Sequence, residues 1–325
     1  MMQLPNASHS ISEHFTRAFH SLCEAAESYY YQSKLDEALG ILRTALQLTT
    51  AKEVQPRDRL TLQLQYGKIL VAHYFLANRD FSLMLTILQE ARQLAEEIHD
   101  EKGSADALCL LGQAYYNKRL NTGEGDYDQA LTYFQQTLKL REHLRDTRGI
   151  SEALFYCGLV HEQCQLDDKA LAYYTDALQF AELYNHKLEK SFALRHIAGI
   201  ARNKSELDEA LNYALTSLAL REEIGFRSYL PFSHLLVGDI YQDRNDQENA
   251  LMHYQNAQAL AEEMGIKSAQ VFSLLALGDM QLAQQDVDQA RGNFERAHTL
   301  AEELQLPYAL DAVHTRLSAE AVRKL

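Results

Sequence analysis

The sequence predicts an all-α protein made of stacked helical hairpins, and three observations indicate this fold class. Apolar residues recur at steps of three and four, which is typical of one buried helix face. Only four prolines and fourteen glycines interrupt the 325 residues, so long helices are compatible with the composition. Small residues repeat at intervals of 40 positions from residue 130 onward, namely Ala130, Ala170, Ala210, Ala250 and Ala290. We therefore expect a solenoid of about seven hairpins.

The predicted repeat array covers residues 11–306. Residues 1–10 are polar, contain Pro5 and show no periodicity, so we expect a flexible N-terminus. After the array, residues 307–325 carry one apolar stripe, which predicts a capping helix over the last hairpin. The repeats are expected near 12–50, 57–99, 103–145, 147–185, 187–225, 227–265 and 267–305.

Two of the repeats are longer than the others. In repeat two the additional residues, AHYFLANRD at 72–80, are partly apolar and favour an extended helix. In repeat three the segment LNTGEGD at 120–126 has the composition of a loop between helices. In the regular repeats each helix is expected to be about 17 residues long, or ~26 Å. Asn185, Gly225 and Gly265 stand where a helix C-terminus favours a left-handed residue.

The stretch 231–267 shows the repeat most clearly. It carries small and aromatic residues in alternation, at Gly238, Tyr241, Ala250, Tyr254 and Ala257. This pattern resembles the tetratricopeptide repeat (TPR), in its 40-residue form. Such arrays occur in spindle-orientation adaptors, in Rap-type bacterial quorum-sensing regulators and in the effector-binding region of the maltose-regulon activators. The resemblance implies a right-handed superhelix that binds a protein, a peptide or a small effector.

Composition narrows the classes of partner. The chain has 31 Lys and Arg against 45 Asp and Glu, a formal net charge of −14, which disfavours nucleic acids and anionic membranes as partners. The N-terminus does not resemble a signal peptide, and no apolar run approaches the ~18 residues of a membrane span. The four cysteines have no CxxC spacing. We expect them to be reduced and buried in a cytoplasmic protein.

The resemblance also implies where a partner would lie, because the first helix of each TPR hairpin lines the concave groove. Counted from the small residue of each repeat, the candidate binding residues are Tyr116, Asn117, Phe155, Gln163, Arg195, His196, Arg202, Asn203, Asp239, Gln242, Asp243 and Asp279. Arg195 and Arg202 lie two turns apart on one helix face. Two hypotheses follow for these arginines. They bind a carboxylate or phosphate of the partner, or they pair with Asp239 and Asp243 of the next repeat. For Phe155, likewise, contact with a ligand and a place in the core are both open.

The sequence does not indicate an enzyme. It contains no HExxH, GxSxG or GxxxxGK[ST] motif, and we expect no metal and no cofactor. The pairs Glu222–Glu223, Glu262–Glu263 and Glu302–Glu303 recur with the scaffold, which is typical of a solvated face. Two functions remain. One is a scaffold that holds a protein or peptide segment in its groove. The other is a sensor that changes shape on binding a small effector or short signalling peptide. The sequence gives no indication of the oligomeric state.

Overall fold

The computed structural model describes residues 11–77 and 81–318, and within these ranges the chain is all-α with sequential hairpin packing, which confirms the predicted solenoid class. The expected flexible N-terminus, residues 1–10, and residues 319–325 of the expected capping segment lie outside the described residues. The helices are α1 (Ile11–Tyr31), α2 (Leu35–Leu48), α3 (Pro56–Ala77), α4 (Phe81–Glu97), α5 (Glu101–Thr122), α6 (Asp128–Leu144), α7 (Thr147–Gln163), α8 (Asp167–Leu183), α9 (Lys187–Asn203), α10 (Leu207–Glu223), the 3-10 turn η1 (Arg227–Tyr229), α11 (Leu230–Asp243), α12 (Gln247–Glu263), α13 (Lys267–Ala283), α14 (Val287–Leu304) and α15 (Pro307–Leu317).

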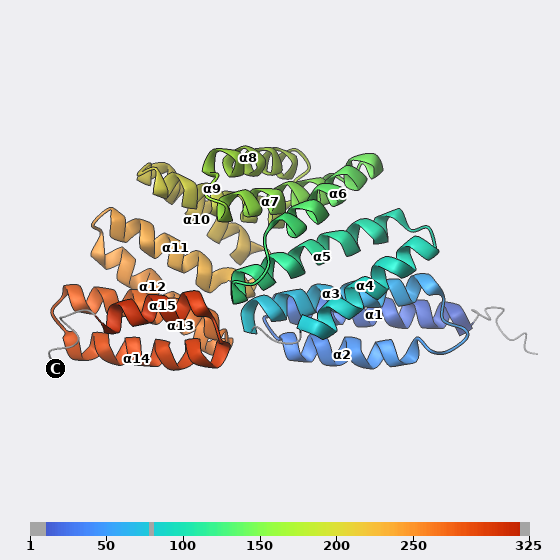
Figure 1. Cartoon of the computed structure of the whole chain (residues 1–325), viewed down its shortest axis with the longest axis horizontal. Helices are drawn as coiled ribbons and strands as arrows, with labels where there is room; N and C mark the ends of the chain where they lie inside the picture. The colour runs from blue at the N-terminus through green and yellow to red at the C-terminus, as the bar shows by residue number, and fades with distance from the viewer. Residues whose placement is uncertain (1–10, 78–80, 319–325) are drawn as a thin grey trace, which may run out of the picture.

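The array bends until its two ends approach each other. In Figure 1 the first hairpins, in blue, and the last, in orange and red, lie beneath the arch formed by α7 to α10. Helix α1 contacts η1, α3 contacts α13, and α5 contacts α15. A hydrogen bond from Ser228 Oγ to the carbonyl of Tyr30, at 3.1 Å, joins the two arms. The concave side is therefore enclosed between the arms.

Left-handed residues end the helices at a constant interval. From Arg145 onward they occur every 20 positions, at Arg145, Gln165, Asn185, Ser205, Gly225, Asn245, Gly265, Gln285 and Gln305. At these positions the amide binds a carbonyl of the last helical turn, as in Asn185 N to Glu182 O at 3.3 Å. The three sites expected from sequence are confirmed. Of the other six, only Asn245 is a residue type that favours this conformation, so residue type did not mark the remaining five.

Four of the hairpins are closed by an aromatic ring that packs on a glycine, at Gly112, Gly158, Gly238 and Gly278. A Cβ built on Gly238 would lie 2.6 Å from the ring of Tyr254, and one on Gly158 would lie 2.5 Å from the ring of Tyr174. Both rings come from the second helix of the same hairpin. The glycines are therefore required for close approach within a hairpin. The regular helices, such as α9 and α10, are 17 residues long as expected.

The two irregular repeats differ in how they use their additional residues. Helix α3 is 22 residues long and includes residues 72–77 of the expected extension, whereas residues 78–80 lie outside the described ranges. Helix α5 also has 22 residues and continues to Thr122, so the loop expected over 120–126 is wrong for its first three positions. Asn121 is buried and donates a hydrogen bond to the carbonyl of Tyr74 at 3.1 Å, which supports the helix there. Gly123, at φ 74°, ends α5.

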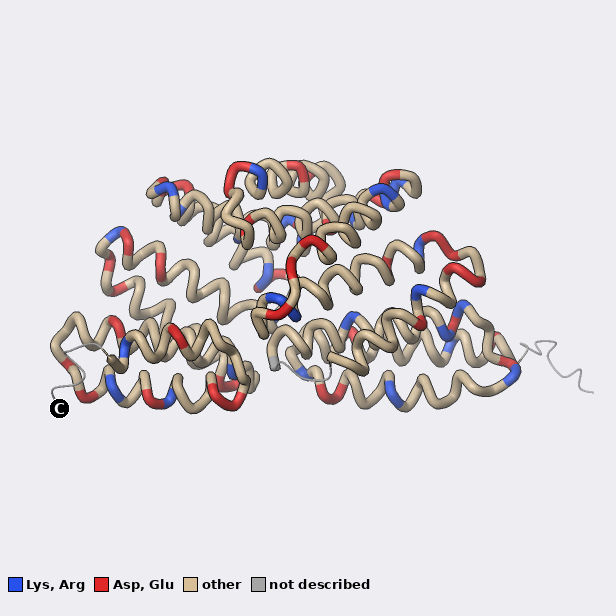
Figure 2. The backbone as a smooth tube through the Cα atoms, viewed as in Figure 1, with Lys and Arg blue, Asp and Glu red and all other residues tan. Residues whose placement is uncertain are grey.

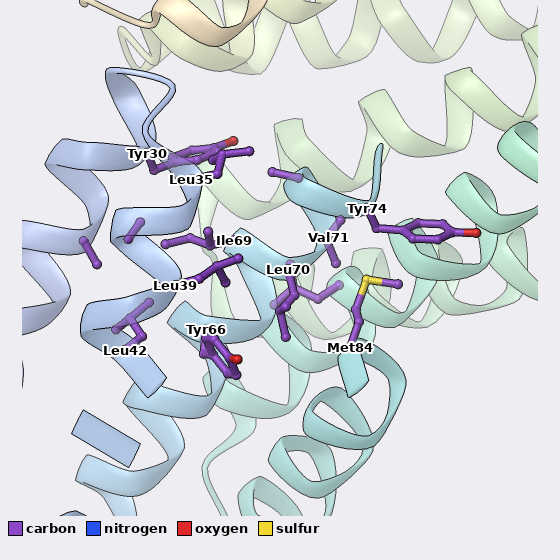
Figure 3. Close-up of a cluster of buried hydrophobic side chains, with 14 of the residues drawn as sticks. Tyr30, Leu35, Leu39, Leu42, Tyr66, Ile69, Leu70, Val71, Tyr74 and Met84 are labelled. Atoms are coloured by element: carbon purple, nitrogen blue, oxygen red, sulfur yellow. The ribbon is translucent and has the colours of Figure 1, made fainter. Parts of the chain in front are cut away.

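The core follows the hairpin interfaces. Figure 3 shows Leu39 of α2 against Ile69 and Leu70 of α3, all three buried. Charged residues gather at the turns at the hairpin ends, where Figure 2 shows acidic and basic positions interspersed. None of the described helices has the length and hydropathy of a membrane span.

The expectation of four buried cysteines is wrong for one of them. Cys109 and Cys157 are buried and Cys23 is partly buried, but Cys164 is exposed. Cys164 caps the C-terminus of α7, where the chain turns through solvent.

Candidate functional site

Two adjoining cavities lie between the arms. The central cavity, about 350 Å³, is bounded mainly by α1, α3, α5, α7 and α9 together with η1. The C-terminal cavity, about 660 Å³, is bounded mainly by α11, α13 and α15. The two share Phe75, Leu120, Arg195 and Phe232 in their walls. Both volumes fall in the range of small-ligand sites, about 300–1,000 Å³.

The structure brings eleven of the twelve sequence-predicted residues to these cavities. Arg195 faces both. Tyr116, Asn117, Phe155, Gln163 and His196 line the central cavity. Arg202, Asp239, Gln242, Asp243 and Asp279 line the C-terminal cavity. Asn203 lines neither and is exposed at the end of α9. In this repeat the cavity wall thus ends at Arg202, one residue before the helix end that the prediction included.

Arg202 is paired within the wall of the C-terminal cavity. Its Nε lies 2.6 Å from Asp243 Oδ2 and its Nη1 lies 3.0 Å from Asp239 Oδ2. The Tyr254 hydroxyl lies 2.8 Å from Asp239 Oδ1 and 2.7 Å from Gln242 Oε1. Burial raises the pKa of Asp239, although the positive charge of Arg202 opposes it. Internal pairing is therefore the arrangement that Arg202 adopts.

Asp279 is neutralised by the capping helix. Arg316 of α15 donates from Nε to both carboxylate oxygens, at 2.8 and 2.9 Å, and from Nη2 to Oδ2 at 2.6 Å. This bidentate contact fixes α15 against α13. The charge of Asp279 is thus already balanced within the chain.

One carboxylate of the central cavity is held by two neighbours. Glu162 accepts a hydrogen bond from the Tyr174 hydroxyl at 2.5 Å and lies 2.9 Å from His196 Nδ1. Although burial opposes it, hydrogen bonds from His196 and Tyr174 help to lower the pKa of Glu162 to about 2. Burial lowers the pKa of His196 as well. Since a carboxylate can only accept, Nδ1 of neutral His196 carries its proton and Nε2 is an acceptor.

Arg195 has no such pairing. Its Nη1 lies 3.4 Å from His196 Nε2, a weak contact, and its Nε is buried without a hydrogen-bond partner. It forms no ion pair with any residue in the described ranges. Burial lowers the pKa of Arg195, although the charge of Glu162 opposes it. The hypothesis of internal pairing therefore fits Arg202, which has two carboxylate partners, and does not fit Arg195.

Sequence reasoning missed much of the aromatic wall and one buried cation. Phe155, a predicted residue, is only 5% exposed and stacks on Phe192 with ring centroids 5.4 Å apart, so it belongs to the core that forms the wall. The missed residues are Phe75, Phe192, Arg221, Phe226, Tyr229 and Phe232. Several of them lie in or beside η1, which takes the place of the first turn of the α-helix in this repeat. Arg221 lies on a second helix, which the counting did not include.

No family model matches the chain, and no curated protein matches it in sequence. Similarity appears in solved structures. The Rap conjugation gene regulator of the plasmid pLS20, solved with a Phr peptide, has a TM-score of 0.69 at 16% identity, over 98% of this chain and 82% of that one. NprR in complex with its cognate peptide NprX has a TM-score of 0.65 at 14% identity, over 95% and 86%.

A third similar structure carries an enzyme name. Aspartyl phosphate phosphatase F from Bacillus subtilis has a TM-score of 0.53 at 13% identity, over 99% of this chain and 97% of that one. At such identities the likeness concerns the fold. The chain thus has the fold of a TPR array of the kind found in the Rap and NprR structures.

Proposed function

We propose that this protein is a non-catalytic receptor for a short peptide, which binds in the central and C-terminal cavities. The observation that carries the proposal is the enclosure of two ligand-sized cavities between the arms. Phe75 of α3 stacks on Tyr229 of η1 with ring centroids 6.1 Å apart, so the wall contains side chains from both arms. A long partner helix along an open groove fits this enclosure poorly. A segment of a few residues fits it well.

The similar Rap and NprR structures support this choice, since both are described with bound peptides. A peptide in the two cavities would contact both arms, and it would bind most tightly to the conformation in which the arms are closed. Binding would therefore shift the population of conformations toward the closed form. This is the sensor hypothesis with a peptide as the effector. The proposed function requires no catalysis at the site. The similarity to the phosphatase therefore enters this proposal only as a similarity of fold.

The test is affinity selection of a synthetic hexapeptide library by the full chain, with bound peptides identified by mass spectrometry. We expect a defined set of peptides to be retained by the native protein. Ala276 lines the C-terminal cavity, and Ala276→Trp fills it, so this variant should lose most of that set. Ala283, exposed at the end of the same helix, provides the control Ala283→Trp. Retention of no peptide by the native protein, or of the same set by Ala276→Trp, would overturn the proposal.

A further inference from the structure

Arg221 occupies a position that other repeats fill with a small residue. At intervals of 40 residues the second helices of repeats three to seven carry Arg141, Ala181, Arg221, Ala261 and Ala301. The three alanines are fully buried, and the two arginines are only 2% and 1% exposed. Two of these five repeats therefore have a large cation at the position where the other three have a methyl group.

The first of these arginines is neutralised within the chain. Arg141 Nη1 donates to Asp146 Oδ2 at 2.6 Å, and its Nη2 donates to Asp106. The corresponding positions around Arg221, two repeats or 80 residues later, hold Phe226 and His186 in place of the two aspartates. Arg221 thus lacks both carboxylates that neutralise Arg141.

The surroundings of Arg221 supply neutral contacts only. Its Nη1 donates to Ser233 Oγ at 2.6 Å, and its Nε lies 3.4 Å from Ser191 Oγ. The guanidinium lies 5.2 Å from the ring centre of Phe192 and 5.7 Å from that of Tyr229. No ion pair to Arg221 exists among the residues that the structure describes. Burial and the nearby charge of Arg195 lower its pKa to about 9, so it remains a cation at neutral pH.

Arg195 and Arg221 line the same central cavity from α9 and α10. Glu162, also in this wall, is already engaged by Tyr174 and His196. Lys68, a further cation of the wall, is paired with Glu27 at 2.8 Å. Two guanidinium groups, the buried one of Arg221 and the partly exposed one of Arg195, therefore face one cavity without a carboxylate partner of their own. An uncompensated buried charge is costly, and an anion that enters the cavity would remove much of that cost.

We propose that Arg195 and Arg221 form a receptor for a carboxylate of the bound ligand, either the C-terminus of the peptide or an acidic side chain. The inference rests on the proposed peptide-binding function and names the chemistry of its ligand. Guanidinium groups suit this role because they bind carboxylates through two parallel hydrogen bonds. Arg195 Nη1 makes only a weak contact, 3.4 Å from His196 Nε2, so the Nη groups of Arg195 are donors available to the ligand. The remaining apolar wall, which includes Phe232 and Leu120, accommodates side chains of the ligand.

The experiment compares the hexapeptide library as free acids with the same library amidated at the C-terminus. A second arm exchanges Asp for Asn and Glu for Gln in each retained peptide, which distinguishes a side-chain carboxylate from the C-terminal one. Removal of the carboxylate that binds should weaken affinity about 10- to 100-fold, the range for hydrogen bonds to charged groups. The same loss should appear in Arg195→Gln and Arg221→Gln with the unmodified peptide. Arg227→Gln is the control, because Arg227 pairs with the exposed Glu263 and lines neither cavity.

The outcomes separate the two proposals. If no library member binds in any form, the peptide-receptor function fails. If free and neutralised peptides bind equally, and Arg195→Gln binds as the native protein does, peptide binding stands and the carboxylate receptor is refuted. Circular dichroism shows whether Arg221→Gln folds. If Arg221→Gln does not fold, the carboxylate receptor is tested with Arg195→Gln, at a partly exposed position, and with Arg221→Lys, which keeps the positive charge.

Discussion

The ring of Tyr30, at the end of α1, packs against the ring of Phe226, just before η1, with centroids 5.6 Å apart. Almost two hundred residues separate them in sequence. This contact joins the first hairpin to the junction of repeats five and six, and with the Phe75–Tyr229 stack it closes the superhelix into a ring around the cavities. Closure therefore combines these aromatic contacts with the Ser228–Tyr30 hydrogen bond and with buried aliphatic side chains of both arms, such as Leu39 and Ile266.

The first prediction concerns this closure. Phe75→Ala removes the stack on Tyr229 and the contact with Phe232, and the arms should separate. We expect a larger radius of gyration by small-angle X-ray scattering and a loss of about 2 kcal/mol in the free energy of unfolding. Phe180→Ala is the matched control, because Phe180 is equally half-buried but lies on α8 and stacks on Tyr184. An unchanged radius of gyration in Phe75→Ala would refute the closing role.

The second prediction separates the two arginines of α9. Arg202→Ala leaves Asp239 and Asp243 side by side without their cation, and should lower the free energy of unfolding by about 1–2 kcal/mol. Arg195→Ala removes a guanidinium that has no ion pair, so the unliganded protein should lose less than about 0.5 kcal/mol of its free energy of unfolding. Urea denaturation of both variants measures the difference. Equal losses would contradict the distinction between a paired and an unpaired arginine.

The sequence was sufficient to predict the repeated hairpins but not the contact between the two arms that closes the array. Periodic alanines and the glycine–aromatic pairs such as Gly238 and Tyr254 determine contacts within a hairpin, which are close in sequence. The contact between Tyr30 and Phe226 depends on the rotation that accumulates over five hairpins, and this rotation cannot be predicted from any local sequence pattern. The same limit explains why the candidate site was found only in part.

The missed cation did leave a signal in the sequence. Residues on first helices were found because the repeat places them on the concave side, whereas Arg221 reaches the cavity from a second helix. Arg221 and Arg141 are arginines at a repeat position that is alanine in the other repeats of this series, and this difference was the signal. Comparison of these two positions, and of the residues around them, indicates which arginine lacks an internal partner.

The third prediction concerns the pH dependence of stability. Glu152 on α7 lines a polar pocket with Arg141 and Arg148. Burial raises its pKa to about 7, although the charge of Arg141 opposes the shift. Because this folded-state pKa exceeds the ordinary value of 4.5, the protonated carboxyl is favoured by folding. Its contribution to stability is complete below pH ~4.5 and is lost as the pH rises through about 7.

Glu152→Gln should therefore be more stable than the native protein at pH 8, by about 2–3 kcal/mol, and the difference should vanish near pH ~4.5. Chemical denaturation at the two pH values measures it. Glu142→Gln, at an exposed position on α6, is the control and should change little at either pH. A Glu152→Gln variant that is less stable at pH 8 would mean that the charged carboxylate, in its contact with the arginines, stabilises the fold.

The fourth prediction concerns the glycine beneath the C-terminal cavity. The ring of Tyr254 is 1% exposed, and its hydroxyl is held by Asp239 and Gln242. Because a Cβ on Gly238 would lie 2.6 Å from this ring, the ring would have to move against both hydrogen bonds. Gly238→Ala should therefore lower the free energy of unfolding by about 2–3 kcal/mol.

Gly199 on α9 is the matched control. A Cβ there would meet nothing within 4 Å, so Gly199→Ala should stabilise the helix by about 0.5–1 kcal/mol. Tyr254 also lines the C-terminal cavity, so Gly238→Ala should weaken the binding of hexapeptides that occupy this cavity. If Gly238→Ala instead gained stability as Gly199→Ala does, the ring of Tyr254 would be mobile. The wall of the C-terminal cavity would then adapt to its ligand.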